Sequence, residues 1–152
     1  MILLSHRALL VIAAVADIAI HSRPLPVGAK ALAARLELPP RHLETLLQAL
    51  VRANILKGLR GPRGGYELAR ERRKITAAAV LRAVLHESAA VGGEPDNCKL
   101  VAKVIAPMVE LAGTAFLREL ETITIEDICR RAEELKLTED ATPRTPRTDF
   151  TI

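Results

Sequence analysis

The feature that most constrains the fold is a hairpin pattern placed directly after an amphipathic helix pattern. The strand-like segments Ile55–Leu59 and Tyr66–Ala69 are joined by the sequence Arg-Gly-Pro-Arg-Gly-Gly at residues 60–65. Glycine and proline at such a junction favour a tight turn between antiparallel strands. The segment just before it predicts a helix from about residue 40 to 53, with one apolar face formed by Leu43, Leu46, Leu47 and Leu50.

Further helix signals surround this unit. Ser5 is a good N-cap for a helix to about residue 20, and the nearly all-apolar surface of that helix predicts burial on most sides. Residues 28–36 predict a short helix, so that two short helices separated by a tight turn follow a core helix, as in helix-turn-helix proteins. Thr76 can cap a fourth helix that runs to about Glu87.

The composition agrees with a mainly helical fold. Hydrophobic residues make up 49% of the 152 residues, yet the chain has one Tyr, two Phe and no Trp. The core must therefore be built from Leu, Val, Ile and Ala, which favours packed helices. The sequence predicts a mainly α fold: a winged helix-turn-helix with a two-stranded β wing and a long dimerisation helix.

The long helix is predicted to begin at Asp96 or Asn97 and to reach about Leu120, with Pro107 kinking or splitting it. A second copy of the chain is the simplest cover for its apolar stripe, which gives a two-fold homodimer; packing back onto the first helix is the alternative. Thr124 can cap a last helix to about Leu137. The stripe consists of Leu100, Val101, Val104, Ile105, Met108, Leu111, Ala112, Ala115 and Phe116.

These patterns divide the chain into four parts. Residues 1–88 are expected to form a winged helix-turn-helix DNA-binding domain, and residues 89–96, rich in small residues, a loop. Residues 97–137 are expected to form dimerisation helices. Residues 138–152 are rich in Pro and Thr without an apolar period, which predicts a disordered tail.

The positive charge of the chain is concentrated in one short region. Residues 52–74 contain eight Lys or Arg and two Asp or Glu, whereas residues 75–152 contain nine and thirteen. A charge run is most often a solvated surface, but concentration beside an acidic remainder favours a patch that faces a polyanion such as DNA. Phosphate contacts are also expected from Arg70, Arg72, Arg73 and Lys74.

Cysteine content and hydropathy indicate a reduced, cytoplasmic protein. Cys98 and Cys129 are too few and too far apart for a disulfide framework or a cysteine-rich zinc site, so no metal is expected. The apolar stretch Ala8–Ile20 is too short to cross a membrane, and it contains Asp17 and lacks a signal-peptidase pattern. It is interpreted as a buried helix, and no membrane association is expected.

Four segments of the chain resemble the Rrf-two-type winged-helix regulators, a likeness that covers about residues 1–128. The resemblance implies a homodimeric transcriptional regulator whose third helix enters the major groove of an operator in double-stranded DNA. It also implies that the wing enters the minor groove and that the long helix crosses its partner. The matching residues are Leu4-Ser5, Ala31-Leu32-Ala33, Leu-Pro-Pro-Arg-His-Leu-Glu at 38–44 and Leu-Arg-Gly-Pro-Arg-Gly-Gly-Tyr-Glu-Leu-Ala-Arg at 59–70.

The resemblance places the major-groove contacts on Arg41, His42, Glu44 and Thr45, and the minor-groove arginine on Arg60. Glu44 could accept a hydrogen bond from a cytosine amino group, and Arg41 or Gln48 could contact purines or phosphates. His42 could equally be a solvent-facing residue. In the wing, glycines allow close backbone approach to phosphates and arginines supply charge, at Arg60, Gly61, Arg63, Gly64 and Gly65.

The chain departs from the family in its cysteines. Many members hold an iron-sulfur cluster with three cysteines after the fourth helix, but here this region has Cys98 alone and all four histidines precede it. No cofactor is therefore expected, the alternative being a cluster whose ligands are shared between two subunits. Cys98 is a candidate redox sensor because backbone amides at a helix start favour a thiolate, although Asp96 opposes this and an inert residue is the alternative. Cys129 is expected to pack in the core.

The predicted function is that of a sequence-specific DNA-binding transcriptional regulator, a repressor, acting as a homodimer. The alternative is a winged-helix protein-interaction module whose DNA binding is vestigial or depends on a protein partner. An enzyme is not expected, because no nucleophile lies beside a plausible base and no glycine-rich phosphate loop follows a strand. The operator, the regulated genes and the effector are not encoded in any recognisable pattern.

Overall fold

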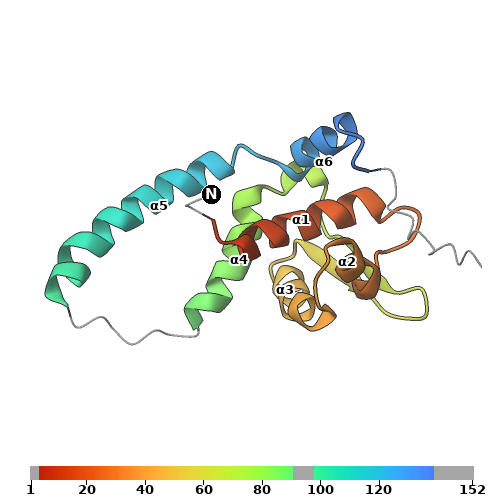
Figure 1. Cartoon of the computed structure of the whole chain (residues 1–152), viewed down its shortest axis with the longest axis horizontal. Helices are drawn as coiled ribbons and strands as arrows, with labels where there is room; N and C mark the ends of the chain where they lie inside the picture. Colours follow the sequence, from red (N-terminus) through yellow and green to blue (C-terminus); the bar gives the residue numbers. More distant parts are fainter. Residues whose placement is uncertain (1–3, 91–97, 139–152) are drawn as a thin grey trace, which may run out of the picture.

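The computed structural model describes residues 4–90 and 98–138, and most of these are helical (Figure 1). The predicted mainly α fold with a two-stranded antiparallel sheet is confirmed. A 3-10 turn, η1, precedes α4, and a π-helical segment, η2, precedes α5. The elements in chain order are α1 His6–His21, α2 Ala29–Arg35, α3 Pro40–Arg52, β1 Leu56–Leu59, β2 Gly65–Leu68, η1 Arg72–Lys74, α4 Ala77–Ala90, η2 Val101–Ile105, α5 Ala106–Leu120 and α6 Ile125–Glu134.

Helix α1 is the central element of the head, as the sequence predicts. Its first turn is capped by Ser5, whose side-chain oxygen accepts a hydrogen bond from the Ala8 N–H at 3.2 Å. Val11, Val15 and Ile18 are fully buried, and α4, α6, α2 and β2 all contact this helix. An apolar helix with neighbours on several sides needs no polar face.

The helix-turn-helix is joined to α1 by an ion pair. Asp17 is the one acidic residue of α1, and its carboxylate accepts three hydrogen bonds from the Arg35 guanidinium of α2, at 2.9, 3.1 and 2.6 Å. Both side chains are mostly shielded from solvent. The turn between α2 and α3 places Glu37 at a φ of 53°, and the Leu38 N–H donates to the Ala33 carbonyl oxygen at 2.9 Å. Helix α3 is therefore held at a fixed angle to α1.

The wing is tied to the linker between α1 and α2. Strands β1 and β2 pair with Leu56 opposite Leu68 and Leu59 opposite Gly65. On the other side of β2, Val27 and Tyr66 exchange both backbone hydrogen bonds, at 2.9 and 2.8 Å. This bridge, which the sequence pattern does not predict, anchors the hairpin to the head.

Helix α6 belongs to the head rather than to the dimerisation region, which differs from the predicted grouping of residues 97–137. The Ala77 N–H donates to the Ile123 carbonyl and the Ile125 N–H to the Ile75 carbonyl, both at 2.8 Å. Ile125 and Cys129 are fully buried in the main core beside α1. The predicted cap at Thr124 is confirmed as a capping box with Asp127.

The region around the predicted loop differs slightly from expectation. Helix α4 continues to Ala90, so the first two residues of the predicted loop 89–96 are helical. The rest of that loop, the N-caps Asp96 and Asn97 and the predicted tail from residue 139 onward lie outside the described residues. The predicted tail begins at residue 138, which is described and partly exposed.

The long helix is interrupted where Pro107 is predicted to disturb it. Helical structure begins at Lys99, passes through the π-helical segment η2 and continues as α5, with Pro107 in the first turn of α5. Proline has no N–H to donate to a preceding carbonyl, which explains an irregular turn here. In Figure 1 the helix extends away from the head. Its end contacts the head through Phe116, Leu117 and Leu120, which pack with Ala77, Ala78 and Leu81.

Most of the predicted stripe of the long helix is uncovered in the single chain. Leu100, Met108 and Leu111 are 61%, 69% and 75% exposed, and Val109 is exposed as well. Only the end of the stripe packs near α1, so the alternative of a helix folded back along α1 does not hold. None of the described helices combines the length and the apolar character that a membrane crossing requires.

Replacing Gly65 by alanine is expected to destabilise the protein by about 1–3 kcal/mol. An added Cβ would lie 2.5 Å from the Val27 carbonyl oxygen, so the bridge between Val27 and Tyr66 would have to separate. Urea denaturation measures the change in the free energy of unfolding. Gly58→Ala is the control in the same hairpin, because its Cβ meets only the Tyr66 ring at 3.8 Å. Equal stabilities of the two variants would contradict this role of the bridge.

Candidate nucleic-acid interface

Helix α3 separates a buried face from an exposed one. Leu43, Leu47 and Leu50 are buried, and the helix begins without a side-chain cap after Pro39. The helix dipole favours a phosphate at this start, and the amide it offers is that of Arg41, because Pro40 has no N–H and the His42 N–H donates to the Pro39 carbonyl oxygen at 3.0 Å. All the residues predicted to contact bases are exposed: Arg41, His42, Glu44, Thr45 and Gln48.

The structure brings three of these residues together with the start of α1. Arg41, His42 and Thr45 line a shallow groove whose opposite wall is the first turn and a half of α1. That wall contributes His6 and Arg7, two residues that sequence reasoning did not assign to the interface. Their only sequence signal is proximity to the N-cap of α1, and the packing of α1 against the head is needed to place them beside α3.

The wing tip presents Arg60 and Arg63 to solvent, as predicted. Among residues 4–90 and 98–138, neither arginine has an acidic partner. The turn between them closes through a hydrogen bond from the Gly64 N–H to the Gly61 carbonyl oxygen at 2.9 Å. In Figure 1 the hairpin projects at the same lower edge of the molecule as α3.

The three wing glycines have structural reasons of their own. Gly61 has a φ of 115°, a conformation that other residues rarely adopt. A Cβ on Gly64 would lie 2.3 Å from the Leu59 carbonyl oxygen, and Gly65 is constrained by Val27. Gly64 and Gly65 are only partly exposed. The fold thus accounts for these glycines, and their contact with DNA stays a prediction.

The basic segment after the wing is largely engaged with acidic side chains. Arg72 forms an ion pair with Glu126 of α6, and the Nε of Arg73 lies 2.5 Å from a Glu71 carboxylate oxygen. Hydrogen bonding and charge from Arg73, together with the charge of Lys74, lower the pKa of Glu71. Arg70 donates from Nε to the Asn54 carbonyl oxygen at 3.1 Å. Phosphate contacts by Arg70, Arg72, Arg73 and Lys74 stay a prediction.

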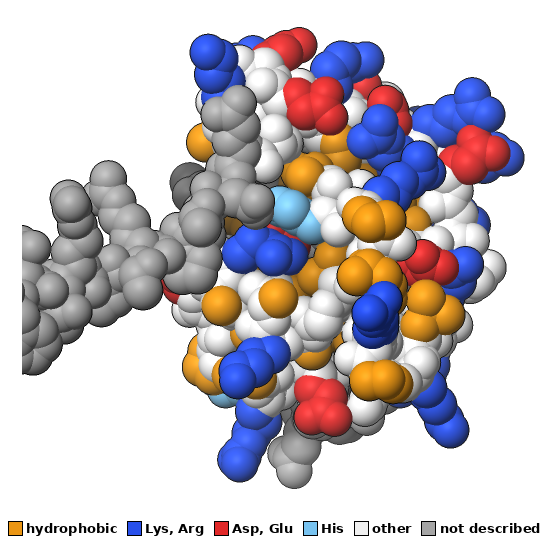
Figure 2. Space-filling model, turned by 90° about the vertical axis from the view of Figure 1, so that its right-hand side faces the viewer, with side chains coloured by type: hydrophobic (Ala, Val, Ile, Leu, Met, Phe, Trp, Pro, Cys, Tyr) orange, Lys and Arg blue, Asp and Glu red, His pale blue; other side chains and the backbone are white. Residues whose placement is uncertain are grey.

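Figure 2 shows the side of the molecule that lies on the right in Figure 1. Lys and Arg side chains are spread over this face, with hydrophobic patches between them and fewer acidic groups. Of the eight basic residues between positions 52 and 74, all are exposed except Arg72, which is partly exposed. Such a surface attracts a polyanion and is sensitive to salt.

The two cysteines lie in different surroundings. Cys98 is exposed beside the start of the long helix, and its carbonyl oxygen accepts the Ala102 N–H at 3.0 Å. Cys129 is buried in the head, as predicted, with its Sγ 3.9 Å from the Ala16 carbonyl oxygen, and burial raises the pKa of its thiol. Within the described part of the chain, no group of three or more His, Cys, Asp or Glu could hold a metal ion. A redox role for Cys98 stays a prediction.

Comparison of sequences identifies relatives along most of the chain. The profile of the Rrf2 family, described as an iron-dependent transcriptional regulator, matches residues 4–131. Protein rrf2 of Nitratidesulfovibrio vulgaris strain Hildenborough is 31% identical over 119 residues, which are 76% of this chain and 79% of that protein. The regulator IscR of Vibrio atlanticus is 34% identical over 73 residues, 48% of this chain and 42% of its own length.

Solved structures of regulators have the same fold. IscR of T. potens matches with a TM-score of 0.65 and 30% identity over 88% of this chain and 90% of its own. CymR, the global cysteine regulator of B. subtilis, matches in fold with a TM-score of 0.62 and 23% identity over 86% of this chain and 98% of its own. These proteins are transcriptional regulators and not enzymes. The chain belongs to the Rrf2 family of winged-helix, DNA-binding transcriptional regulators.

Proposed function

We propose that the protein is a sequence-specific repressor that binds a partly palindromic operator as a homodimer in the bacterial cytoplasm. The observation that carries this proposal is the exposed face of α3 beside two wing-tip arginines that have no acidic partner among the described residues. A surface in which base-reading side chains lie next to uncompensated charge suits a DNA groove.

In the proposed complex, α3 enters the major groove. The positive end of its dipole and the Arg41 N–H would approach a phosphate, and the groove shared with α1 adds His6 and Arg7 as contacts to the DNA backbone. Arg41 and Gln48 can donate to purine edges, and Glu44 can accept from a cytosine amino group. The rigid joint between α1 and α2 through Asp17 and Arg35 supports this role, because groove reading requires a fixed helix orientation.

The wing would place Arg60 and Arg63 in or beside the minor groove. Because their guanidinium groups form no ion pair within the described residues, binding DNA need not first break a contact in the protein. The hairpin is anchored by the bridge from Val27 to Tyr66, one residue pair from the turn end of the ladder, so its tip has a defined position. Insertion of arginine into a minor groove is favoured where that groove is narrow.

We propose that the exposed stripe of the long helix is covered by the same stripe of a second copy. Burying large apolar side chains such as Met108 and Leu111 is favourable by about 25 cal/mol per Å² of apolar surface. An adjoining apolar groove between α1, α4 and α5, lined in part by Leu85 and Phe116, extends this surface onto the head. A two-fold dimer presents two α3 helices to two half-sites, which explains the expected palindrome.

Repression is the favoured outcome because it requires only occupancy of the promoter. An activator needs a further surface that contacts the transcription machinery, whereas DNA and a second copy account for the exposed residues of α3, the wing tip and the long helix. We further propose that this member acts without an iron-sulfur cluster, since it has only Cys98 and Cys129 and the second of these is buried.

Replacing both Arg60 and Arg63 by alanine is expected to weaken operator binding. It should also reduce the salt slope, which is the slope of the logarithm of the binding constant against the logarithm of the salt concentration, by about 1 for each phosphate that is no longer bound. Fluorescence anisotropy with a labelled operator, found by selection from fragmented host DNA, gives the affinity at several salt concentrations. The control is Arg130→Ala with Arg131→Ala, which removes the same charge from α6. Unchanged DNA binding in the wing variant would contradict the assignment and favour a protein partner instead.

Replacing Met108 by glutamate is expected to give a monomer, because a charge in the dimer interface would be desolvated. Light scattering after size exclusion measures the mass, and operator affinity should fall about a hundredfold with the loss of two-headed binding. Lys103→Glu is the control, since it adds the same side chain to a charged position of the same helix region. A dimeric Met108→Glu protein with full affinity would exclude this interface.

Protein purified without oxygen is expected to lack iron and visible iron-sulfur absorption, and a chelator should leave its operator affinity unchanged. Alkylation in native buffer should modify Cys98, whereas Cys129 should react only after unfolding because it is buried and the pKa of its thiol is raised. Mass spectrometry identifies the modified residue. Stoichiometric iron that disappears in Cys98→Ala would show that a cluster is held after all.

A further inference from the structure

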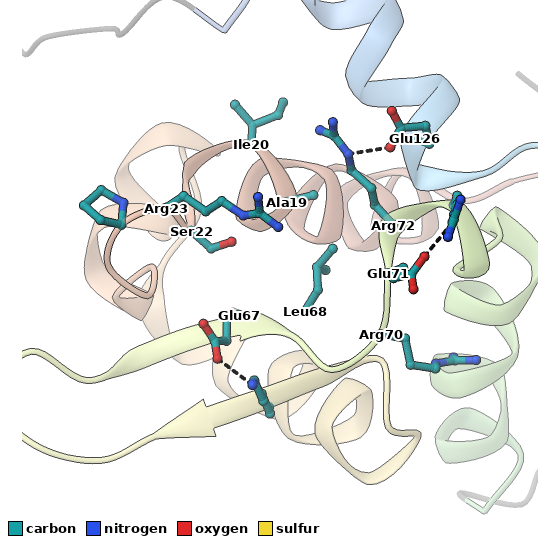
Figure 3. Close-up of a pocket in the computed structure, with 13 residues that line it drawn as sticks. Ala19, Ile20, Ser22, Arg23, Glu67, Leu68, Arg70, Glu71, Arg72 and Glu126 are labelled. Carbon is teal, nitrogen blue, oxygen red and sulfur yellow. Dashed lines mark hydrogen bonds and ion pairs between the residues drawn. The ribbon is translucent and has the colours of Figure 1, made fainter.

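A pocket on the head is not explained by the DNA interface. It lies between the end of α1, the base of the wing, η1 and the start of α6, and its volume is about 730 Å³ (Figure 3). This size is within the range of small-molecule sites. Its lining comes from segments between residues 19 and 126 that are far apart in the sequence.

The charges of the lining do not cancel. Each of its three carboxylates has a basic partner in the lining: Glu67 lies 2.7 Å from Lys57, Glu71 lies 2.5 Å from Arg73, and Glu126 is paired with Arg72. The two arginines that remain are Arg23 and Arg70.

These two arginines carry charge that no carboxylate of the described residues balances. Arg23 forms no ion pair in residues 4–90 and 98–138, and Arg70 donates one Nε hydrogen bond to a backbone carbonyl. In Figure 3 the guanidinium of Arg23 lies across the pocket beside Ala19, whereas Arg70 lies on the side near η1 with its guanidinium pointing away from Arg23, so an anion held by both must turn the Arg70 side chain inward. Guanidinium groups bind carboxylates and phosphates by paired, charge-assisted hydrogen bonds.

The floor of the pocket is apolar. Leu68 of β2 points toward Ala19 of α1 in Figure 3, and Ile20, on the other side of α1, adds a further apolar side chain to the lining. An apolar floor with cationic groups at its rim suits a small organic anion more than a hydrated inorganic ion.

We propose that this pocket binds a small multivalent organic anion, a polycarboxylate or a phosphorylated metabolite, and that the anion regulates DNA binding. The regulatory half of this inference rests on the proposed function. Lys57 and Glu67 belong to the wing strands. Arg70 donates a hydrogen bond to the carbonyl oxygen of Asn54, which lies just after α3. Arg23 lies in the linker that continues to the bridge at Val27.

These connections give the anion a route to both DNA-contacting elements. An anion that recruits Arg23 and Arg70 pulls on the linker and on the end of α3 together. It also competes with Glu67 for Lys57 and so alters the base of the wing. A ligand changes an equilibrium to the extent that its affinity differs between the two states, so a shift of the wing on binding is sufficient.

The test is calorimetric titration of the full-length protein with citrate and, separately, with inorganic pyrophosphate. One of the two is expected to bind, and which one binds separates the carboxylate from the phosphate class. Arg23→Ala and Arg70→Ala should each weaken binding about tenfold, while Arg131→Ala should not. Thermal melting confirms that each variant is folded. Absence of binding to both anions, or equal affinity in Arg23→Ala, would overturn the site.

Operator anisotropy with the bound anion, against chloride at equal ionic strength, then tests regulation. An affinity change that Arg23→Ala abolishes supports the inference, and no change overturns its regulatory half while operator binding stands. Loss of all operator binding, with anion binding intact, would reject the proposed function and leave the pocket. If Arg23→Ala weakens DNA binding without any anion and lowers the salt slope by about 1, the pocket takes a DNA phosphate and the inference fails.

Discussion

The burial of α1 is the constraint on which the rest of the head depends. Val11, Val15 and Ile18 are fully buried, and the contacts of α1 extend to α2, α4, α6 and the wing. Asp17 and Arg35 add direction to this otherwise non-directional packing, because a bidentate ion pair fixes both the position and the rotation of α2. The orientation of α3 therefore depends on the ion pair between α1 and α2.

Backbone contacts position the wing together with the packing of Leu56, Tyr66 and Leu68 against the main core. The paired hydrogen bonds of Val27 and Tyr66 hold β2 against the linker, and Gly65 permits the approach because it has no Cβ. The glycines of the wing are therefore required by the backbone conformation of the hairpin. The arginines at its tip have no such structural role and can serve binding. The resemblance to the Rrf2 family in this segment includes both the glycines that the hairpin backbone requires and the arginines at its tip. It is therefore informative about the fold.

Local features of the sequence predicted local structure well. The caps at Ser5 and Thr124 and the disturbance near Pro107 follow from interactions within one helical turn. The Val27 bridge and the docking of α6 depend on segments that meet only in the folded chain, so no periodicity encodes them. In the candidate site, the exposed positions of α3 were predictable from its leucine spacing, but the neighbours His6 and Arg7 were not.

The same distinction applies to charge. The sequence identifies residues 52–74 as basic, but folding decides which of these charges are available to a ligand. Arg72 and Arg73 are neutralised by Glu126 and Glu71, one distant and one adjacent in sequence. The uncompensated charge of this region is thereby divided between the wing tip and the rim of the pocket at the wing base. The arginines at the wing tip can therefore attract DNA, while those at the rim of the pocket can respond to a small anion. The hairpin connects the two groups of charges.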